Sequence, residues 1–241
     1  MDKTVVQRDG LDLVMDIAGP AKGPTVVLLH AGAETREVWF PITPALNEAG
    51  WRTIAPDFRG HGESGRAPVY RFEDFLDDTE SIIQQRAGKP LVIVGGSIGG
   101  AAGLVLTGED RIPANGLVLL DLPTSPTPQA GLNERDKIQT ARERNNPAVE
   151  SIDSTFLDGN FLKAVIKDMD RWRRAGKNVQ VPTLLVRGTR SNVVDDRALK
   201  RFKEDIPNAK VTDLDAGHLV ARDQPKQLAK LLVDFLRTIP C

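Results

Sequence analysis

The segment Gly95-Gly96-Ser97-Ile98-Gly99 constrains this chain more than any other. It reads G-x-S-x-G and lies between an apolar run at 91–94 and a stretch of small residues at 101–106 that is typical of a helix. Where a strand turns sharply into a helix at a serine, side chains on the flanking glycines would collide with the neighbouring strand and helix. Ser97 would then project above the end of a sheet, as a nucleophile elbow. The turn also aims the first free N–H groups of the helix at whatever the hydroxyl attacks.

The remainder of the chain alternates apolar runs with helical stretches. Residues 24–29 form an apolar run, the pattern of a strand buried on both faces of a parallel sheet. The apolar residues on either side of Arg8-Asp9-Gly10 predict an N-terminal β-hairpin. Further strands are expected at 51–56, 91–95, 117–120, 182–186 and 209–212, and helices at about 37–49, 71–87, 98–107, 196–205 and 224–238. Strands that alternate with helices predict an α/β fold with a parallel, doubly wound sheet.

The interval 122–178 interrupts this alternation. Three prolines near its start end the preceding strand and prevent an immediate helix; they are Pro123, Pro126 and Pro128. The interval continues with charged helical sequence, and it is too small and too polar to form a large core of its own. We therefore expect one α/β core, made of residues 1–121 and 179–241, with a helical lid inserted at 122–178.

Composition excludes several classes of function. The 241 residues carry a formal net charge of −1, so nothing suggests an electrostatic nucleic-acid binder. The single cysteine, Cys241, cannot form an internal disulfide, and no cluster of residues has the spacing of metal ligands. The N-terminal sequence lacks the apolar core of a signal peptide, and no apolar run approaches the roughly 18 residues of a membrane span. We expect a cytoplasmic protein without a metal, nucleic-acid or membrane partner, while homo-oligomer formation stays open.

A base for Ser97 can be chosen from only three histidines. A serine hydroxyl is a poor nucleophile at neutral pH, so it needs a base, and the base needs an orienting partner. His218 is the best candidate because it lies in a loop after the last expected strand and follows Ser97 in the chain. His30 and His61 are expected to be structural or to line the pocket.

A tetrahedral intermediate also requires two N–H donors for its oxyanion. We expect the N–H of Ile98, directly after the serine, to supply one and the N–H of Gly32, in the loop after the 24–29 run, to supply the other. Glu34 and Arg36, close behind Gly32, are candidates to contact a polar substrate. Three aromatic residues are candidates for an apolar substrate pocket: Trp39, Phe40 and Trp172.

Five segments in a fixed order carry a resemblance to a known family: LLHAGAETREVW, APDFRGHGESG, GGSIGG, VPTLLVRGTRSNVV and DAGHLV. On these motifs the chain resembles the α/β-hydrolase superfamily and is similar to its small, cofactor-free serine hydrolases, namely esterases, lactonases, perhydrolase-like enzymes and C–C bond hydrolases. The resemblance implies an eight-stranded, mostly parallel sheet with helices on both faces, and it implies no cofactor. Epoxide hydrolases and haloalkane dehalogenases of this superfamily use an aspartate nucleophile, whereas the elbow here carries Ser97.

The residue that orients the base is the point at which this chain departs from the pattern. Similar members carry an aspartate in the Arg-Ser-Asp-Val-Val stretch after the penultimate core strand, where this chain has Asn192. An asparagine can accept a hydrogen bond from His218, but it cannot stabilise the imidazolium by charge. The motif favours Asn192 as the occupant of the acid position. Two alternatives stay open: Asp121, at the end of the 117–120 strand, where some members carry the acid, and Asp195 or Asp196 downstream.

These features together predict a serine hydrolase that cleaves a small or medium ester or lactone through an acyl-enzyme. Two other hypotheses remain. Asn192 suggests a catalytically weak protein that keeps the pocket to bind or sense a small ligand. A lyase or a cofactor-free oxygenase would keep the fold and use His218 as a base. The sequence does not identify the substrate.

Overall fold

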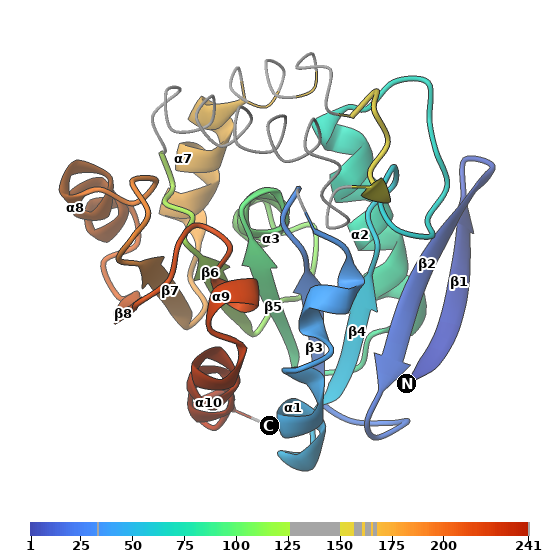
Figure 1. Ribbon diagram of the computed structural model, residues 1–241. Helices are drawn as coiled ribbons and strands as arrows, with labels where there is room; N and C mark the ends of the chain where they lie inside the picture. Colours follow the sequence, from blue (N-terminus) through green and yellow to red (C-terminus); the bar gives the residue numbers. More distant parts are fainter. Residues whose placement is uncertain (33, 126–149, 157–160, 162–164, 166–167, 241) are drawn as a thin grey trace.

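A computed structural model describes residues 1–32, 34–125, 150–156, 161, 165 and 168–240 of the chain. Its centre is an eight-stranded sheet in the order β1-β2-β4-β3-β5-β6-β7-β8 (Figure 1). The strands are β1 (Asp2–Arg8), β2 (Leu11–Ala18), β3 (Thr25–Leu29), β4 (Arg52–Pro56), β5 (Leu91–Gly96), β6 (Gly116–Leu120), β7 (Thr183–Gly188) and β8 (Lys210–Leu214). The expected eight-stranded α/β sheet is confirmed.

The sheet is parallel from β4 to β8, and only its N-terminal edge is antiparallel. β1 pairs with β2 as the expected hairpin, and β2 pairs antiparallel with β4. Every residue of β3, β5 and β6 is buried, because helices cover both faces of the sheet at these strands. Their apolar runs follow from this double burial. In the β5–β6 ladder the last paired residues are Gly96 and Leu120.

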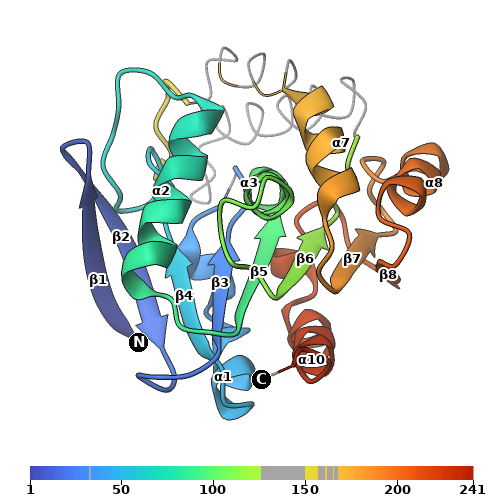
Figure 2. The same cartoon turned by 180° about the vertical axis from the view of Figure 1, so that it is seen from behind.

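Two layers of helices enclose the sheet. One layer packs on the face seen in Figure 2: α2 (Phe72–Arg86), α3 (Ile98–Gly108), α7 (Met169–Asn178) and α8 (Asp196–Asp205). The other covers the opposite face: α1 (Thr43–Glu48), α9 (Val220–Asp223) and α10 (Pro225–Leu236). Each layer has its own hydrophobic cluster, with Phe75 and Phe202 fully buried in the first and Leu46 and Leu232 in the second.

The expected helix at 37–49 is divided into two pieces. A 3-10 turn, η1 (Arg36–Trp39), is followed by a break and then by α1. Pro41 explains the break, because proline has no N–H to continue a helical ladder. Pro44 is tolerated at the start of α1, where the first N–H groups have no partner within the helix.

The described end of the interval 122–178 packs on the core. α7 lies directly against α3, and a Cβ on Gly108 would meet the backbone of Ala175. Trp172 and Ala175 are buried in the same cluster as α3. The remainder of the expected lid includes residues 126–149, which lie outside the described residues. The division of the chain into core and lid therefore stays a prediction.

Candidate active site

Ser97 stands at a strained turn between β5 and α3. It is the residue before the first turn of α3, and its backbone has φ 48° and ψ −115°, a region that residues with a Cβ rarely adopt. The flanking glycines permit the turn: a Cβ on Gly99 would lie 2.5 Å from the carbonyl oxygen of Leu29, and one on Gly95 would meet the backbone of Gly99. This is the geometry that the G-x-S-x-G segment predicts, with the side chain of Ser97 half-buried.

His218 is paired with Asp121. Its Nδ1 lies 2.9 Å from Oδ2 of Asp121, whose side chain is fully buried. The other carboxylate oxygen of Asp121 accepts a hydrogen bond of 3.0 Å from the N–H of Gly188. Asp121 also has a positive φ of 48°, and its N–H donates to the carbonyl of Val186. Asp121 is therefore held by β7 on one side and presents its second oxygen to the histidine ring.

The loop that carries His218 is fixed at its base. The N–H of Gly217 donates to Oδ2 of Asp223 at 2.7 Å. Gly188 packs so closely on this loop that a Cβ there would collide with the carbonyl oxygen of Gly217. The ring therefore stays beside Asp121. No hydrogen bond joins Ser97 to His218 among the described residues, although catalytic hydrogen bonds are often long before substrate binds.

The three other candidates for the acid lie elsewhere. Asn192 is exposed, and the Nδ1 of His218 faces Asp121 instead. Asp195 caps α8, since its Oδ1 accepts the N–H of Ala198 at 2.7 Å. Asp196 is fully exposed and lies 3.5 Å from Arg187. The sequence favoured Asn192 because it stands at the acid position of a loop motif. The hydrogen bond to His218 comes instead from Asp121, whose place in the structure depends on where β6 ends.

His30 fixes the peptide that carries the N–H of Gly32. Its Nε2 accepts the N–H of Phe58 at 3.0 Å, so its Nδ1 carries the proton and donates to the carbonyl of Ala31 at 2.8 Å. Complete burial lowers the pKa of His30 to about 4, which keeps the ring neutral. The carbonyl of Ala31 and the N–H of Gly32 belong to one planar peptide, so His30 sets the direction of that N–H. This is a structural role, as expected.

His61 holds the next peptide of the same loop. Its Nε2 lies 3.2 Å from the carbonyl oxygen of Gly32, and its Nδ1 lies 3.1 Å from that of Arg59. A neutral ring can donate to only one of them. Burial nevertheless lowers the pKa of His61 to about 3, and the neighbouring His30 acts in the same direction.

Ile98 lies at the first turn of α3, where its N–H has no partner within the helix.

Arg36 is not open to a substrate, contrary to the expectation that it might contact one. It is 5% exposed and forms ion pairs with Asp16 (2.8 Å), Asp57 and Glu63. Asp57 also accepts the N–H groups of Arg36 and Glu63. This cluster joins the loop after β3 to the loop after β4. The segment APDFRGHGESG is therefore built around a buried ion-pair cluster, which sequence reasoning missed.

The aromatic candidates are divided between core and surface. Trp39 is fully buried in the cluster with Leu46, and Trp172 packs against Phe72 with ring centroids 5.8 Å apart. Phe40 is exposed. In the described structure both indoles therefore pack the interior. Their contact with a substrate stays a prediction.

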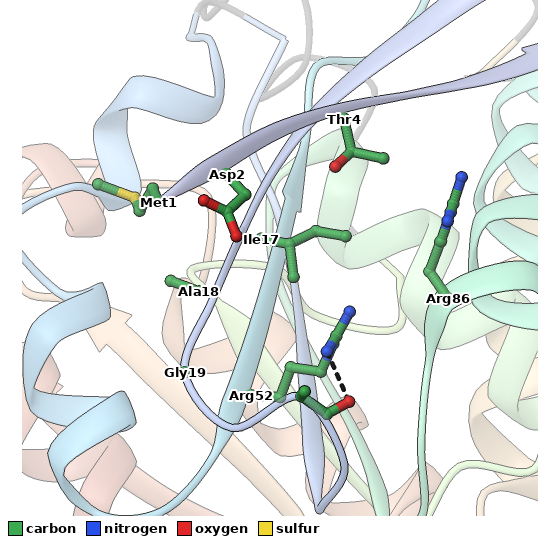
Figure 3. Close-up of a pocket in the computed structure, with 9 residues that line it drawn as sticks. Met1, Asp2, Thr4, Ile17, Ala18, Gly19, Arg52 and Arg86 are labelled. Carbon is green, nitrogen blue, oxygen red and sulfur yellow. Dashed lines mark hydrogen bonds between the residues drawn. The ribbon is translucent and has the colours of Figure 1, made fainter.

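A pocket of about 310 Å³ lies away from the residues of the site (Figure 3). Its lining includes Asp2, Arg52 and Arg86, and Arg52 donates to the carbonyl of Ala21 at 2.7 Å. Within the described ranges, no three His, Cys, Asp or Glu side chains are grouped as they would be around a metal ion. None of the helices described is both long and apolar enough to cross a membrane.

Comparison with known proteins gives a consistent assignment. A family model described as alpha/beta hydrolase fold matches residues 24–144, which is half of the chain. Proline iminopeptidase PfmaB of Pestalotiopsis fici is 35% identical over 99 residues, but the match covers only 39% of this chain and 35% of that protein. Lipase LipV of Mycobacterium tuberculosis is 25% identical over 257 residues, with 92% and 97% covered. The solved structure of an enol-lactonase from Burkholderia xenovorans LB400 has a TM-score of 0.79 and 20% identity, with 97% and 100% covered.

Proposed function

Because the chain belongs to the α/β hydrolase fold family, we propose that it is a serine hydrolase that cleaves a small or medium carboxylic ester or lactone through an acyl-enzyme. The fold alone does not select a reaction, so the proposal depends on the residues at the ends of β5 and β6 and in the loop after β8. Ser97 is the nucleophile, His218 is the base and Asp121 orients the base. No cofactor takes part in the proposed reaction.

The proposed reaction has two halves. Ser97 Oγ attacks the carbonyl carbon, and Nε2 of His218 takes its proton, because Nδ1 is occupied by Asp121. The N–H groups of Ile98 and Gly32 stabilise the oxyanion of the tetrahedral intermediate. The intermediate collapses to the acyl-enzyme as His218 returns the proton to the leaving alcohol oxygen. A water molecule, deprotonated by the same ring, then releases the acid and restores Ser97.

One observation carries the proposal: the hydrogen bond of 2.9 Å between His218 and the buried Asp121. A carboxylate at Nδ1 fixes the tautomer in which Nε2 can accept a proton, and it stabilises the imidazolium that forms. Asn192, being exposed, is left without a role in this scheme. The case for a catalytically weak binding protein is weakened as a result, since it depended on Asn192 as the partner of the base.

Among the similar proteins, the names of a lipase and an enol-lactonase support ester or lactone chemistry, whereas proline iminopeptidase PfmaB is named as a peptidase. A lyase or cofactor-free oxygenase on the same site would yield products other than an acid and an alcohol. Mass analysis of the products of any consumed ester or lactone separates these reactions from hydrolysis.

A fluorophosphonate probe tests the proposal without knowledge of the substrate. Such a probe reacts with a serine that a neighbouring base activates. We expect a single adduct, which peptide mass spectrometry locates on Ser97, and no adduct on the Ser97→Ala variant. The half-buried Ser191, outside the elbow, provides a matched control, since Ser191→Ala should leave the adduct unchanged. A folded wild-type protein that forms no adduct would remove the basis of the proposal.

A further inference from the structure

Residues 151–156, which belong to the interval expected as a lid, are fixed to the loop after β4. The N–H of Asp153 donates to the carbonyl of Gly60 at 2.8 Å, and the hydroxyl of Tyr70 donates to Oδ2 of Asp153 at 2.7 Å. Tyr70 is buried and lies against Gly60, where a Cβ would come within 2.7 Å of the Tyr70 ring. These two hydrogen bonds form an anchor that joins the segment 151–156 to the core.

The anchor places Phe156 on the loop that carries Gly32. The N–H of Phe156 donates to the carbonyl of Asp153 at 3.2 Å, so its ring follows the anchor directly. The ring packs edge-on against His61, with centroids 4.4 Å apart. A Cβ on Gly32 would lie 3.3 Å from Cζ of Phe156 and 3.7 Å from Cγ2 of Ile98. Phe156 therefore lies beside both residues whose N–H groups are proposed to stabilise the oxyanion.

Other aromatic rings hold Phe156 in place. The residue is only 7% exposed, and its ring centroid lies 4.6 Å from that of Phe161 and 5.9 Å from those of Phe75 and Tyr70. A side chain packed on several sides keeps its position, because displacing it would leave unfilled space among its neighbours. The ring is thus a fixed surface beside the oxyanion donors.

The order of the strands indicates which part of an ester this ring would face. Ser97 directly follows β5, which has β3 and β4 on one side and β6, β7 and β8 on the other (Figure 1). His218 and Asp121 come from the second side, whereas Phe156 packs on the loops after β3 and β4. In the proposed reaction His218 protonates the leaving alcohol, which must lie on its side of the site. The acyl chain is then directed to the opposite side, toward Phe156.

We propose, resting on the serine hydrolase function above, that Phe156 determines the acyl-chain length that the site accepts. Its ring closes the acyl side, so the preferred substrates carry a short acyl group such as acetyl or butanoyl. Tyr70 acts through its hydrogen bond to Asp153 as a positioning residue for this ring. A longer chain is disfavoured because close-packed rings leave no room for additional methylenes.

Hydrolysis of p-nitrophenyl butanoate and p-nitrophenyl octanoate tests the proposal. Wild-type protein should prefer the butanoate. Phe156→Ala opens the acyl side, and the ratio of kcat/KM for octanoate to that for butanoate should rise by about tenfold or more, since each methylene that becomes buried contributes up to about fourfold. An unchanged ratio in Phe156→Ala would overturn the proposal.

Phe235→Ala is the matched control. Phe235, on α10, is 6% exposed, close to the 7% of Phe156. It lies beside Gly116, where a Cβ would be 3.4 Å from the Phe235 ring, at the opposite end of β6 from Asp121. Its loss should leave the octanoate-to-butanoate ratio within about twofold of the wild-type ratio.

Tyr70→Phe tests the anchor. This variant removes the hydroxyl that donates to Asp153 and keeps the ring against Gly60. The octanoate-to-butanoate ratio should move in the same direction as in Phe156→Ala but by less, about twofold to fivefold. A loss of rate that is equal for both esters would show that Tyr70 only stabilises the fold, and would contradict its role as a positioning residue.

Ligand binding separates this proposal from the serine hydrolase function. Calorimetry on Ser97→Ala compares the affinity for octanoate with that for butanoate, and it needs no turnover. Adding Phe156→Ala should raise the relative affinity for octanoate. If wild-type protein hydrolyses neither ester and forms no probe adduct while this affinity ratio rises, the serine hydrolase function fails and the size limit set by Phe156 stands. An unchanged affinity ratio would overturn the size limit, even in a protein whose Ser97 reacts with the probe.

Phe156→Leu keeps the test decisive if Phe156→Ala does not fold. Leucine preserves an apolar side chain at this position and opens a smaller space. Both ratios should then shift toward octanoate by about threefold. The absence of a shift in this variant would likewise contradict the proposal.

Discussion

Ser97 and Asp121 occupy equivalent positions on neighbouring strands. Each follows one member of the last β5–β6 pair, Gly96 and Leu120, and each has a φ of 48°. Both strands thus end at the same edge of the sheet and are followed by a residue with positive φ, which turns the chain sharply. The proposed nucleophile and the proposed acid therefore owe their separation to the spacing of two adjacent parallel strands.

Replacing the carboxylate that faces His218 should remove most of the activity. In serine proteases, the change of the triad aspartate to asparagine lowers kcat by about 10⁴ because the wrong histidine tautomer is favoured. We expect Asp121→Asn to lower the fluorophosphonate labelling rate by about 10²–10⁴. Asn192→Asp is the matched control and should leave the rate within about twofold, because this exposed residue does not face the ring. A large gain in rate with Asn192→Asp would return the acid to that loop.

The turn at Ser97 should store measurable strain. A residue with a Cβ in a sparsely populated backbone region costs on the order of 1–3 kcal/mol, and glycine largely avoids this cost. We expect Ser97→Gly to have a free energy of unfolding about 1 kcal/mol higher than that of Ser97→Ala. Urea denaturation of the two inactive variants measures the difference. Equal or reversed stabilities would indicate that the elbow is not strained.

The ion-pair cluster around Arg36 should be essential for stability. Arg36→Met leaves Asp57 buried without its cation, and breaking a buried ion pair by removing one partner costs about 3–5 kcal/mol. Arg237 offers a matched control, because it is exposed and pairs with Asp234 at 3.3 Å on the surface. Arg237→Met should cost less than about 1 kcal/mol. Chemical denaturation that found similar losses for both variants would argue against a structural role of the cluster.

The free energy of unfolding should decrease as the pH is lowered from 7 to 5, because His30 and His61 are buried as neutral rings. Their folded-state pKa values of about 4 and about 3 lie below the ordinary value of 6.5, so at pH 5 unfolding takes up a proton at each ring. The stability that these neutral rings contribute is complete above pH 6.5 and is lost as the pH falls toward the folded-state pKa values of about 4 and about 3. Two protons correspond to a slope of about 2.7 kcal/mol per pH unit near pH 5. Denaturation curves between pH 7 and 5 measure this slope, and His61→Gln should reduce it by about half; a stability independent of pH would contradict the burial of neutral rings.

Much of the fold could be predicted from local sequence. The doubly buried strands β3, β5 and β6 read as apolar runs, and the elbow glycines lie where backbone contacts exclude a Cβ. The break between η1 and α1 was missed, although Pro41 is its local signal. The sequence favoured Asn192 and kept Asp121 only as an alternative partner of His218, because Asp121 is 97 residues away in sequence and meets the ring only through the order of the strands. The role of Arg36 was equally hidden, since its three acidic partners come from β2 and from the loop after β4.

With the proposed acid directly after β6, the loop after β7 has no chemical task in the proposed mechanism. It needs only to connect Gly188, the last residue of β7, whose N–H supports Asp121, to Asp195, which caps α8. Between these two fixed points Asn192 is exposed and open to engineering, whereas Val193 and Val194 are buried. A library confined to position 192 could vary this loop while the proposed proton-transfer machinery stays intact.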